Sequence, residues 1–233
     1  MKTLNVSTTV GELVRAAPIR ARVFEKLGID YCCGGKKPLA EICAAKGLDA
    51  VTVLTMLEAM DGAAGGDAPV NADAMRLGVL CDHIETAHHG YLREELPRLD
   101  FMTRKVAAVH GSDEPRLMEI RRVFEQFAPE LMSHMADEEA QVFPRIRRLD
   151  ATGGSAAERE ELQAAVAELE REHAEAGGAL ERFRELTDGY APPEWACNTF
   201  RALYDSLARL ERDMHQHVHK ENNVLFPRAL AAA

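Results

Sequence analysis

The sequence predicts an all-α protein, in which a small helical N-terminal domain precedes an up-down four-helix bundle. Apolar residues recur at helical spacing along almost all of the 233 residues, and the alternation typical of strands is nearly absent. One segment, DGAAGGDAPVNAD, lacks that period and is rich in Gly, Ala, Asp and Pro, which is typical of a linker. We therefore expect an N-terminal domain at residues 1–60, a linker at 61–73 and the bundle at 74–233.

Four short helices are expected in the N-terminal domain. Thr8 or Thr9 can cap the first helix, and Gly28 can end the second. Pro38 suits the first turn of the third helix, which Gly47 would stop before a fourth begins. A unit of about sixty residues is only marginally stable by itself. We therefore expect it to pack against another domain or subunit, and we predict a homodimer.

The bundle is expected to contain four longer helices, because the breaks HGSDEP, DATGGS and DGYAPP separate its periodic segments. Phe143-Pro144 and Phe226-Pro227 are expected to end the second and fourth helices, and Pro97 can kink the first. The predicted helices cover residues 75–100, 115–148, 156–187 and 194–225.

Composition limits the classes of partner and compartment. The net charge is −10, whereas nucleic-acid binding usually requires a basic face. No apolar run approaches the roughly 20 residues that span a bilayer, and the start of the chain lacks the apolar core of a signal peptide. Five cysteines, an odd number, argue against a disulfide framework. We expect a cytoplasmic protein with neither nucleic acid nor membrane as a partner.

Histidine and glutamate replace apolar residues on the core stripes of the bundle. Two segments share the pattern H-x-x-x-E-x-x-x-x-F-P-R, and they begin at His134 and His217. In each, the Glu one turn later, Glu138 or Glu221, lies on the same face as the His. His173 occupies a core position of the third helix in the same way. These five side chains are therefore predicted to face the core.

Two carboxylates buried in one core need a positive charge between them. Burying one without a partner costs several kcal/mol, and two would also repel each other. Lys and Arg are absent from the stripes, so a metal is the economical answer. Imidazole nitrogen with carboxylate oxygen suits non-haem iron, manganese or zinc, and carboxylates that can bridge indicate a binuclear site.

The first bundle helix should supply the remaining ligand, and periodicity leaves its identity open. His89 is in phase with the apolar residues that follow it, whereas His88 is in phase with those that precede it. Glu139 is expected to be solvated. Glu130 and Glu172 could orient a ligating His from outside, although surface placement is the simpler interpretation. The other histidines are expected to be exposed: His83, His110, His215 and His219.

Cys32 and Cys33 lie side by side in YCCGG, and a disulfide between them is improbable. Their Cα atoms are about 3.8 Å apart, below the usual disulfide range of about 4.4–6.8 Å. A helix N-terminus and the cations Lys36 and Lys37 follow, and both lower thiol pKa values. We predict reactive thiols that accept iron transiently or relay electrons. The remaining cysteines are predicted to be small buried residues: Cys43, Cys81 and Cys197.

The motifs DYCCGGK, HMADEE, EHAEAG and ENNVLFPRA in combination resemble the repair of iron centres family, the ScdA-like di-iron proteins. The resemblance covers nearly the whole chain and implies a hemerythrin-like bundle that holds two iron ions joined by an oxo bridge. It favours His89 over His88, and it implies that Glu138 and Glu221 bridge the irons. The implied ligands are His89, His134, Glu138, His173, His217 and Glu221.

The resemblance also implies a role in the recovery of iron–sulfur enzymes after damage by nitric oxide or oxidants. Iron donation to a damaged client protein and nitric oxide binding and reduction are both compatible with it, so enzyme activity stays undecided. The alternative is a hemerythrin-type module that binds or senses oxygen, nitric oxide or iron. A ferritin-like oxidase is disfavoured, because that class relies more heavily on carboxylate ligands.

Overall fold

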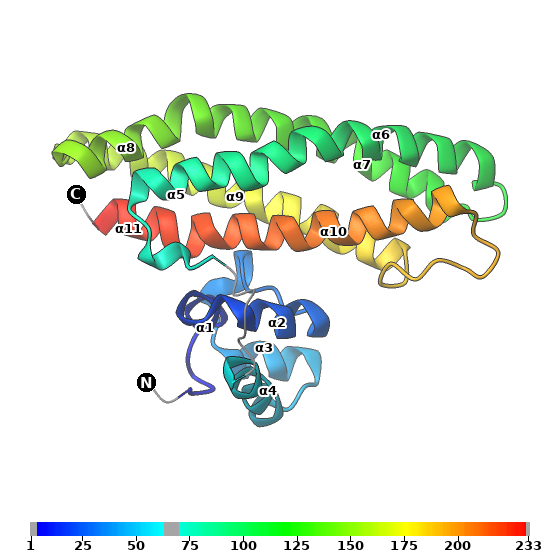
Figure 1. Cartoon of the computed structure of the whole chain (residues 1–233), viewed down its shortest axis with the longest axis horizontal. Helices are drawn as coiled ribbons and strands as arrows, with labels where there is room; N and C mark the ends of the chain where they lie inside the picture. The colour runs from blue at the N-terminus through cyan, green and yellow to red at the C-terminus, as the bar shows by residue number, and fades with distance from the viewer. Residues whose placement is uncertain (1–3, 63–69, 232–233) are drawn as a thin grey trace.

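The structure is a computed structural model that describes residues 4–62 and 70–231. Within these residues the elements are helices, and the only β-type pairing is an isolated bridge between Thr9 and Pro38. Four long rods form a bundle, and a smaller helical domain lies against one side of it, beneath α10 and α11 (Figure 1). The predicted all-α fold class is therefore confirmed.

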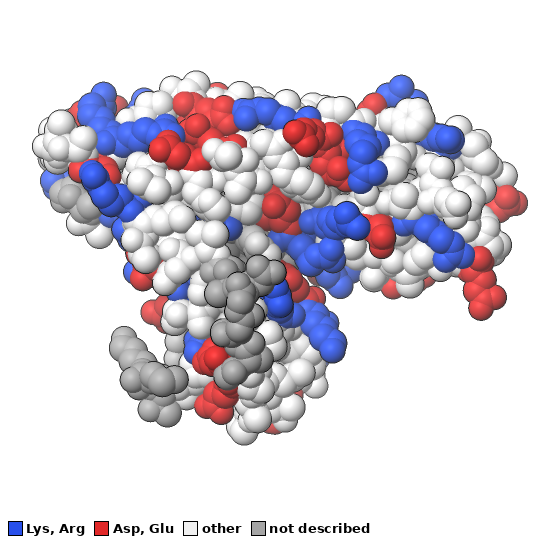
Figure 2. Space-filling view, viewed as in Figure 1, with Lys and Arg blue, Asp and Glu red and all other residues white. Residues whose placement is uncertain are grey.

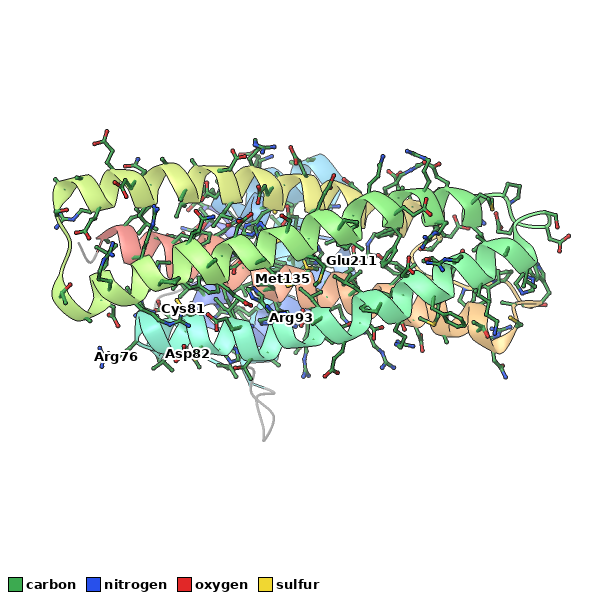
Figure 3. The ribbon with its side chains drawn as sticks, turned by 90° about the horizontal axis from the view of Figure 1, so that it is seen from above. Arg76, Cys81, Asp82, Arg93, Met135 and Glu211 are labelled. Atoms are coloured by element: carbon green, nitrogen blue, oxygen red, sulfur yellow. The ribbon has the colours of Figure 1, made fainter. Side chains whose placement is uncertain are left out.

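Three of the four rods are interrupted by a π-helical turn, and the rods run side by side (Figure 3). The first consists of α5 (Leu77–Ile84), the π turn η4 (Glu85–His89) and α6 (Gly90–His110). The second consists of α7 (Arg116–Asp137), η5 (Glu138–Val142) and α8 (Phe143–Thr152). The third is α9 (Ala156–Leu186), and the fourth consists of α10 (Asn198–Lys220), η6 (Glu221–Leu225) and α11 (Phe226–Ala231).

The Phe-Pro pairs do not end their helices, contrary to the sequence-based expectation. Pro144 and Pro227 lie in the first turns of α8 and α11, where a missing backbone N–H is tolerated. The preceding π turns let each rod continue past the proline. The first rod also runs ten residues beyond the predicted end at residue 100, to His110.

The apolar core of the bundle is divided into two clusters. One is built mainly from α6, α7 and α10 and contains Met135, and the other is built mainly from α5, α8 and α9 and contains Cys81. Both labelled side chains lie inside the bundle (Figure 3). The predicted His and Glu positions lie along the chain at the junction between these clusters, so a polar layer separates two apolar ones.

The N-terminal domain follows its local start and stop signals. Thr9 and Glu12 form a capping box at α1 (Val10–Ala16), and such a cap stabilises a helix by about 1 kcal/mol. Gly28 and Gly47 end α2 and α3 with φ of 62° and 67°, a conformation that favours glycine. The further elements are the 3₁₀ turn Pro18–Arg20, α2 (Ala21–Leu27), the 3₁₀ turn η2 (Cys33–Lys36), α3 (Leu39–Lys46) and α4 (Ala50–Gly62).

The N-terminal domain has its own apolar core and docks on the bundle of the same chain. It docks mainly through α1 and η2, which contact η6, and η2 also contacts α9 and α10. Lys36 Nζ lies 2.7 Å from a carboxylate oxygen of Glu170 on α9. Of the predicted linker at 61–73, residues 61–62 belong to α4 and the turn Ala72–Ala74 begins before its end, while 63–69 lie outside the described residues.

Charged side chains of both signs are interspersed on the face of the molecule in Figure 2. Many charged side chains of the described residues form ion pairs. Arg147, for example, lies 2.7 Å from both Asp82 and Glu85. Among the described helices, none combines the length and the apolar character needed to cross a membrane.

Candidate metal centre

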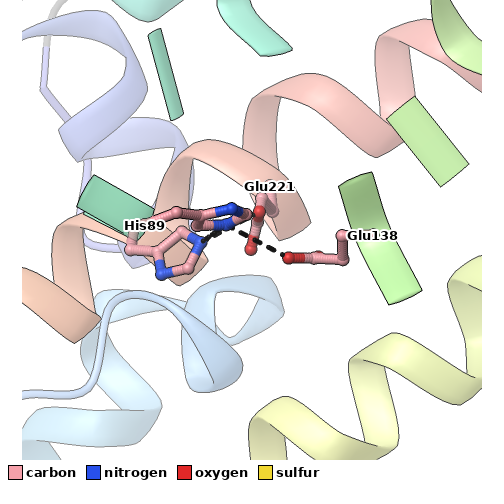
Figure 4. A group of neighbouring side chains, drawn as sticks. His89, Glu138 and Glu221 are labelled. Atoms are coloured by element: carbon pink, nitrogen blue, oxygen red, sulfur yellow. Dashed lines mark hydrogen bonds and ion pairs between the residues drawn. The ribbon is translucent and has the colours of Figure 1, made fainter. Parts of the chain in front are cut away.

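The six residues predicted as ligands come together in the buried polar layer. They form two groups of four in which the donor atoms lie within 4.8 Å of one another. His89 and His217 belong to one group and His134 and His173 to the other. Glu138 and Glu221, both fully buried, belong to both groups, and Figure 4 shows these two with His89.

Each carboxylate offers one oxygen to each histidine pair. The Glu138 oxygens lie 3.3 Å from His89 Nε2 and 3.4 Å from His134 Nε2. The Glu221 oxygens lie 3.1 Å from His217 Nε2 and 3.3 Å from His173 Nε2. This is the arrangement in which two carboxylates can bridge two cations, each of which also meets two imidazole nitrogens.

Outer partners fix the proton on His134 and His173. His134 Nδ1 lies 2.6 Å from Glu172 Oε2, and His173 Nδ1 lies 2.8 Å from Asn222 Oδ1. Both acceptors are oxygens, so each Nδ1 donates to its partner and each Nε2 faces the other ring. The two Nε2 atoms are only 2.9 Å apart. Two neutral rings would direct two lone pairs at each other over this distance, so the arrangement favours a cation between them, either a proton or a metal ion.

The carboxylates lead to the same conclusion. Among the described residues, both oxygens of Glu138 and one oxygen of Glu221 are buried without a hydrogen-bond donor. Such burial costs several kcal/mol unless a charge compensates it. Nitrogen and oxygen donors without a thiolate suit iron, manganese or zinc, so the residues present fit a binuclear metal centre.

The electrostatics of the histidines favour positive charge at this position. Burial opposes the charged form of His134, but the neighbouring carboxylate of Glu138 and the negative charge of Glu221 outweigh it and raise the pKa of His134 to about 10. Burial would also favour the neutral form of Glu221, yet His217 and His173 lower the pKa of this carboxyl well below its usual value. The layer therefore attracts cations.

Comparison with known proteins agrees with this chemistry. The family model described as the hemerythrin HHE cation binding domain matches residues 82–229, and the one described as a domain of unknown function, DUF542, matches residues 6–61. The iron–sulfur cluster repair protein ScdA of Staphylococcus haemolyticus is 35% identical over 217 residues, which cover 93% of this chain and 95% of the relative. The chain belongs to the repair of iron centres family.

Two further relatives of this family are iron–sulfur cluster repair proteins YtfE. The protein of Enterobacter sp. (strain 638) is 35% identical over 224 residues, and that of Escherichia coli O17:K52:H18 is 36% identical over 225 residues. Each alignment covers 95% of this chain and 96% of the relative. The family predicted from the motifs is thereby confirmed.

The π turns explain why periodicity could not choose between two neighbouring histidines in this family member. His88 and His89 end η4, and both are buried, with exposed fractions of 4% and 0%. A π turn inserts one residue and rotates the following side chains about the helix axis, so both face inward. His89 belongs to a group of four, whereas His88 belongs to neither.

His88 instead takes part in a buried polar chain that sequence reasoning missed. Its Nδ1 lies 2.8 Å from Asp213 Oδ1, and Lys220 Nζ lies 2.7 Å from its Nε2. Its ring also stacks on His217, with the centroids 5.3 Å apart. Burial lowers the pKa of Lys220 to about 8. The only sequence signal for Lys220 was its place next to Glu221, one position off the core stripe.

Two expected surface carboxylates are outer partners of histidines. Glu139 was expected to be solvated, but it lies 2.7 Å from His89 Nδ1 and also pairs with Arg93. The expectation of simple surface placement was likewise wrong for Glu172. Its neighbour His173 faces the core, which brings Glu172 to the edge of the core, where it pairs with His134. Glu130 is exposed, as expected.

Several other burial predictions were wrong. His219 is buried, with 6% of its surface exposed, because the N-terminal domain covers it at Tyr31. Cys197 is exposed, since α10 begins only after it. Three histidines expected to be exposed are half-buried: His83, His110 and His215.

Cys32 and Cys33 are less exposed to solvent than the adjacent glycines led us to expect. Cys32 has only 5% of its surface exposed, and Cys33 is half-buried with its Sγ donating to the His173 carbonyl at 3.3 Å. The hydrogen bond from Cys32 lowers the pKa of Cys33, whereas that bond and burial raise the pKa of Cys32. The expectation of two thiolates is therefore wrong for Cys32. Through Cys33 the pair does contact the backbone of His173, a residue of the metal-binding layer in the same chain.

Two cavities border the layer. One of about 240 Å³ reaches His134 and His173 from the surface between α7 and α9, and acidic side chains line it. The other, of about 380 Å³, lies between the N-terminal domain and the bundle next to His88. The acidic residues of the first are Glu130, Asp137, Glu172 and Glu175.

Proposed function

We propose that this chain is an iron–sulfur cluster repair protein whose bundle holds two iron ions. The observation that carries the proposal is the pair of buried carboxylates, Glu138 and Glu221, each of which offers one oxygen to each histidine pair. The names of the relatives, iron–sulfur cluster repair proteins that align over nearly the whole chain, support the client class. Damage by nitric oxide or oxidants is the proposed context.

In this function, the protein holds the metal-binding side chains in fixed orientations. The four histidines and two bridging carboxylates would hold the irons, and the outer acceptors Glu139, Glu172 and Asn222 keep Nδ1 protonated so that Nε2 faces the centre. When bound, the irons would supply one-electron redox chemistry. Six protein ligands for two ions close the site less completely than a full ligand shell would.

Iron donation is the first proposed mechanism, with iron as the cargo. Cys33 supports it, because its sulfur lies 3.3 Å from the backbone oxygen of His173, whose ring belongs to the centre. A thiol in this position can take over an iron ion that leaves the nitrogen and oxygen ligands. The second proposed mechanism is nitric oxide binding and reduction, which the 240 Å³ cavity at His134 and His173 supports by admitting a diatomic molecule.

Anaerobic iron analysis with Mössbauer spectroscopy, before and after nitric oxide, tests the proposal. We expect two irons per chain and a signal of coupled iron, and we expect His134→Ala and Glu221→Ala to abolish both together with repair of a damaged cluster. His110→Ala, whose ring contacts Trp195 and Phe200 outside the centre, is the matched control. Purified protein without iron, or full repair by the two ligand variants, would refute the proposal.

Oxygen titration separates the alternative of a hemerythrin-type binding or sensing module. A stable, reversible oxygen adduct of the reduced protein would favour that module, whereas irreversible oxidation favours repair. We further propose a damaged iron–sulfur protein as the partner and a reducing compartment, the cytoplasm, as the location. All five cysteines are free of disulfide bonds, which supports a reducing compartment.

A further inference from the structure

The loop that precedes the third helix gathers donor atoms that the bundle does not use. Asp30, Cys32 and Cys33 each offer one atom, and these atoms lie within 4.8 Å of one another. Two of the three are sulfurs, whereas the bundle centre has only nitrogen and oxygen donors. The loop therefore offers a softer set of donor atoms than the bundle does.

The spacing of the two sulfurs excludes a disulfide and is compatible with a shared cation as well as with the hydrogen bond between the two thiols. Cys32 Sγ and Cys33 Sγ are 4.0 Å apart. A disulfide requires about 2.05 Å. Two thiolates on one tetrahedral ion, each about 2.3 Å from it, lie about 3.8 Å apart. The observed separation is close to the spacing for a shared ion and twice that of a disulfide.

The carboxylate of Asp30 is held in place to complete this set. Its Oδ1 lies 3.0 Å from Cys32 Sγ and accepts from the backbone N–H of Cys32, and its Oδ2 accepts from that of Gly34 at 2.8 Å. The side chain therefore cannot swing away without losing two hydrogen bonds. The carbonyl oxygen of His173 approaches Cys33 Sγ from the other side, at 3.3 Å.

We propose that Asp30, Cys32 and Cys33 form a third cation site, which takes one thiophilic divalent ion of the class of Fe(II), Co(II) or Zn(II). Binding replaces two S–H protons, which pass to the buffer, by two metal–sulfur bonds, and no electron changes hands. That an ion in this site comes from the bundle and goes to a client rests on the proposed function. The binding itself does not.

Asn223 holds the site against the bundle. Its Nδ2 donates to the Cys32 carbonyl at 3.0 Å. Gly11 and Gly35 leave room for its side chain, because a Cβ at either position would lie 2.4 Å from Asn223 Oδ1. The same π turn carries Glu221 of the bundle centre and Asn222, which bonds to His173. One turn of helix thus joins both cation sites.

Cobalt titration of the reduced, iron-loaded full chain tests the third site. We expect one Co(II) to bind with a thiolate-to-cobalt charge-transfer band, which Cys32→Ser/Cys33→Ser abolishes. Asp30→Asn keeps an amide oxygen for the loop but loses the charge, and should weaken binding at least about tenfold. Cys197→Ser, which removes an exposed thiol outside the loop, is the matched control and should bind cobalt like the parent chain.

Absence of the band from the parent chain, or its persistence in the double serine variant, would overturn the third site. Iron in the bundle is measured in the same samples, so loss of the bundle centre is distinguishable from loss of the loop site. A second variant, Asn223→Ala, tests the attachment: Cys33 should react several-fold faster with iodoacetamide. An unchanged rate would show that Asn223 does not hold the loop.

Discussion

The orientation of each histidine at the metal centre depends on the hydrogen-bond acceptor at its Nδ1 atom. In His89, His134 and His173, the Nδ1 atom faces a side-chain oxygen that belongs to a residue on a neighbouring rod of the bundle. The acceptor decides which nitrogen is free to bind a cation and in which direction it faces. Because these acceptors are half-buried or buried, the ligand geometry depends on residues that a motif alone does not single out.

Removing one outer acceptor should weaken metal binding without unfolding the bundle. Glu139→Ala deprives His89 of its acceptor, and we expect a loss of about 10- to 100-fold in metal affinity. Competition with a chelator of known affinity measures it. Glu168→Ala, which removes an exposed carboxylate paired with Arg171, is the control and should leave the affinity unchanged. Equal affinities for both variants would contradict the assigned role.

Thiol reactivity should rank the remaining cysteines by burial. Cys197 is exposed, whereas Cys43 and Cys81 are buried with 1% and 0% exposed. Burial also raises the pKa of Cys81 to about 12, so almost none of it is thiolate at pH 8. Alkylation of the native chain followed by mass spectrometry should label Cys197 first and Cys81 only after unfolding. Early labelling of Cys81 would contradict the described packing.

Among the secondary-structure elements, a π turn adjoins the ligands on three of the four rods of the bundle. The turn η4 ends at His89, and η5 and η6 begin at Glu138 and Glu221. A helix of uniform period would send the residues after each turn to a different face. The turns also let the rods continue after the ligands, so the second apolar cluster forms on the far side of the polar layer.

A small change in the η2 turn should disturb the contact between the domains. Gly35→Ala places a Cβ 2.4 Å from Asn223 Oδ1, so Asn223 must move and its bond to Cys32 is lost. We expect a loss of about 1 kcal/mol in unfolding free energy, measured by urea denaturation. Gly178→Ala on α9 meets nothing within 4 Å and should instead stabilise by about 0.5–1 kcal/mol. The same sign for both variants would contradict this account.

At the scale of the whole molecule, the bundle is two apolar cores joined by a charged layer. Without a cation, Glu138 and Glu221 are buried close together with unpaired oxygens. Chelation should therefore lower the thermal unfolding midpoint. Each ion present at 100 times its dissociation constant contributes about 2.7 kcal/mol. Scanning calorimetry with and without chelator measures the difference, and Glu138→Gln/Glu221→Gln should lose the dependence. An identical midpoint for loaded and chelated protein would count against the metal centre.

Packing of the N-terminal domain bears on the predicted homodimer. The reason given by the sequence was that so small a domain gains from a partner surface. In the structure the bundle of the same chain supplies such a surface, through η6, α9 and α10. The homodimer stays a prediction, and light scattering coupled to size exclusion tests it: the mass of a single chain at all concentrations would refute it.

Sequence patterns alone were enough to predict the helical class, the caps and stops of the N-terminal domain, and the inward face of five ligand positions. These features depend on local spacing: Thr9 with Glu12, or His134 with Glu138 one turn apart, meet wherever a helix forms. The family motifs added His89. Burial of a carboxylate without a cation on its own stripe was enough to indicate a metal.

The groups that hydrogen-bond to the ligands, and those that contact them from the N-terminal domain, became visible only in the folded chain. Glu172 reaches His134 from another rod, and Cys33 meets His173 across 140 positions of sequence. No periodicity encodes such pairs, because each depends on how two rods are rotated against each other, and the π turns change that rotation. Nor does any periodicity predict the hydrogen bond from Asn223 to Cys32, because it forms only where the N-terminal domain packs against the bundle.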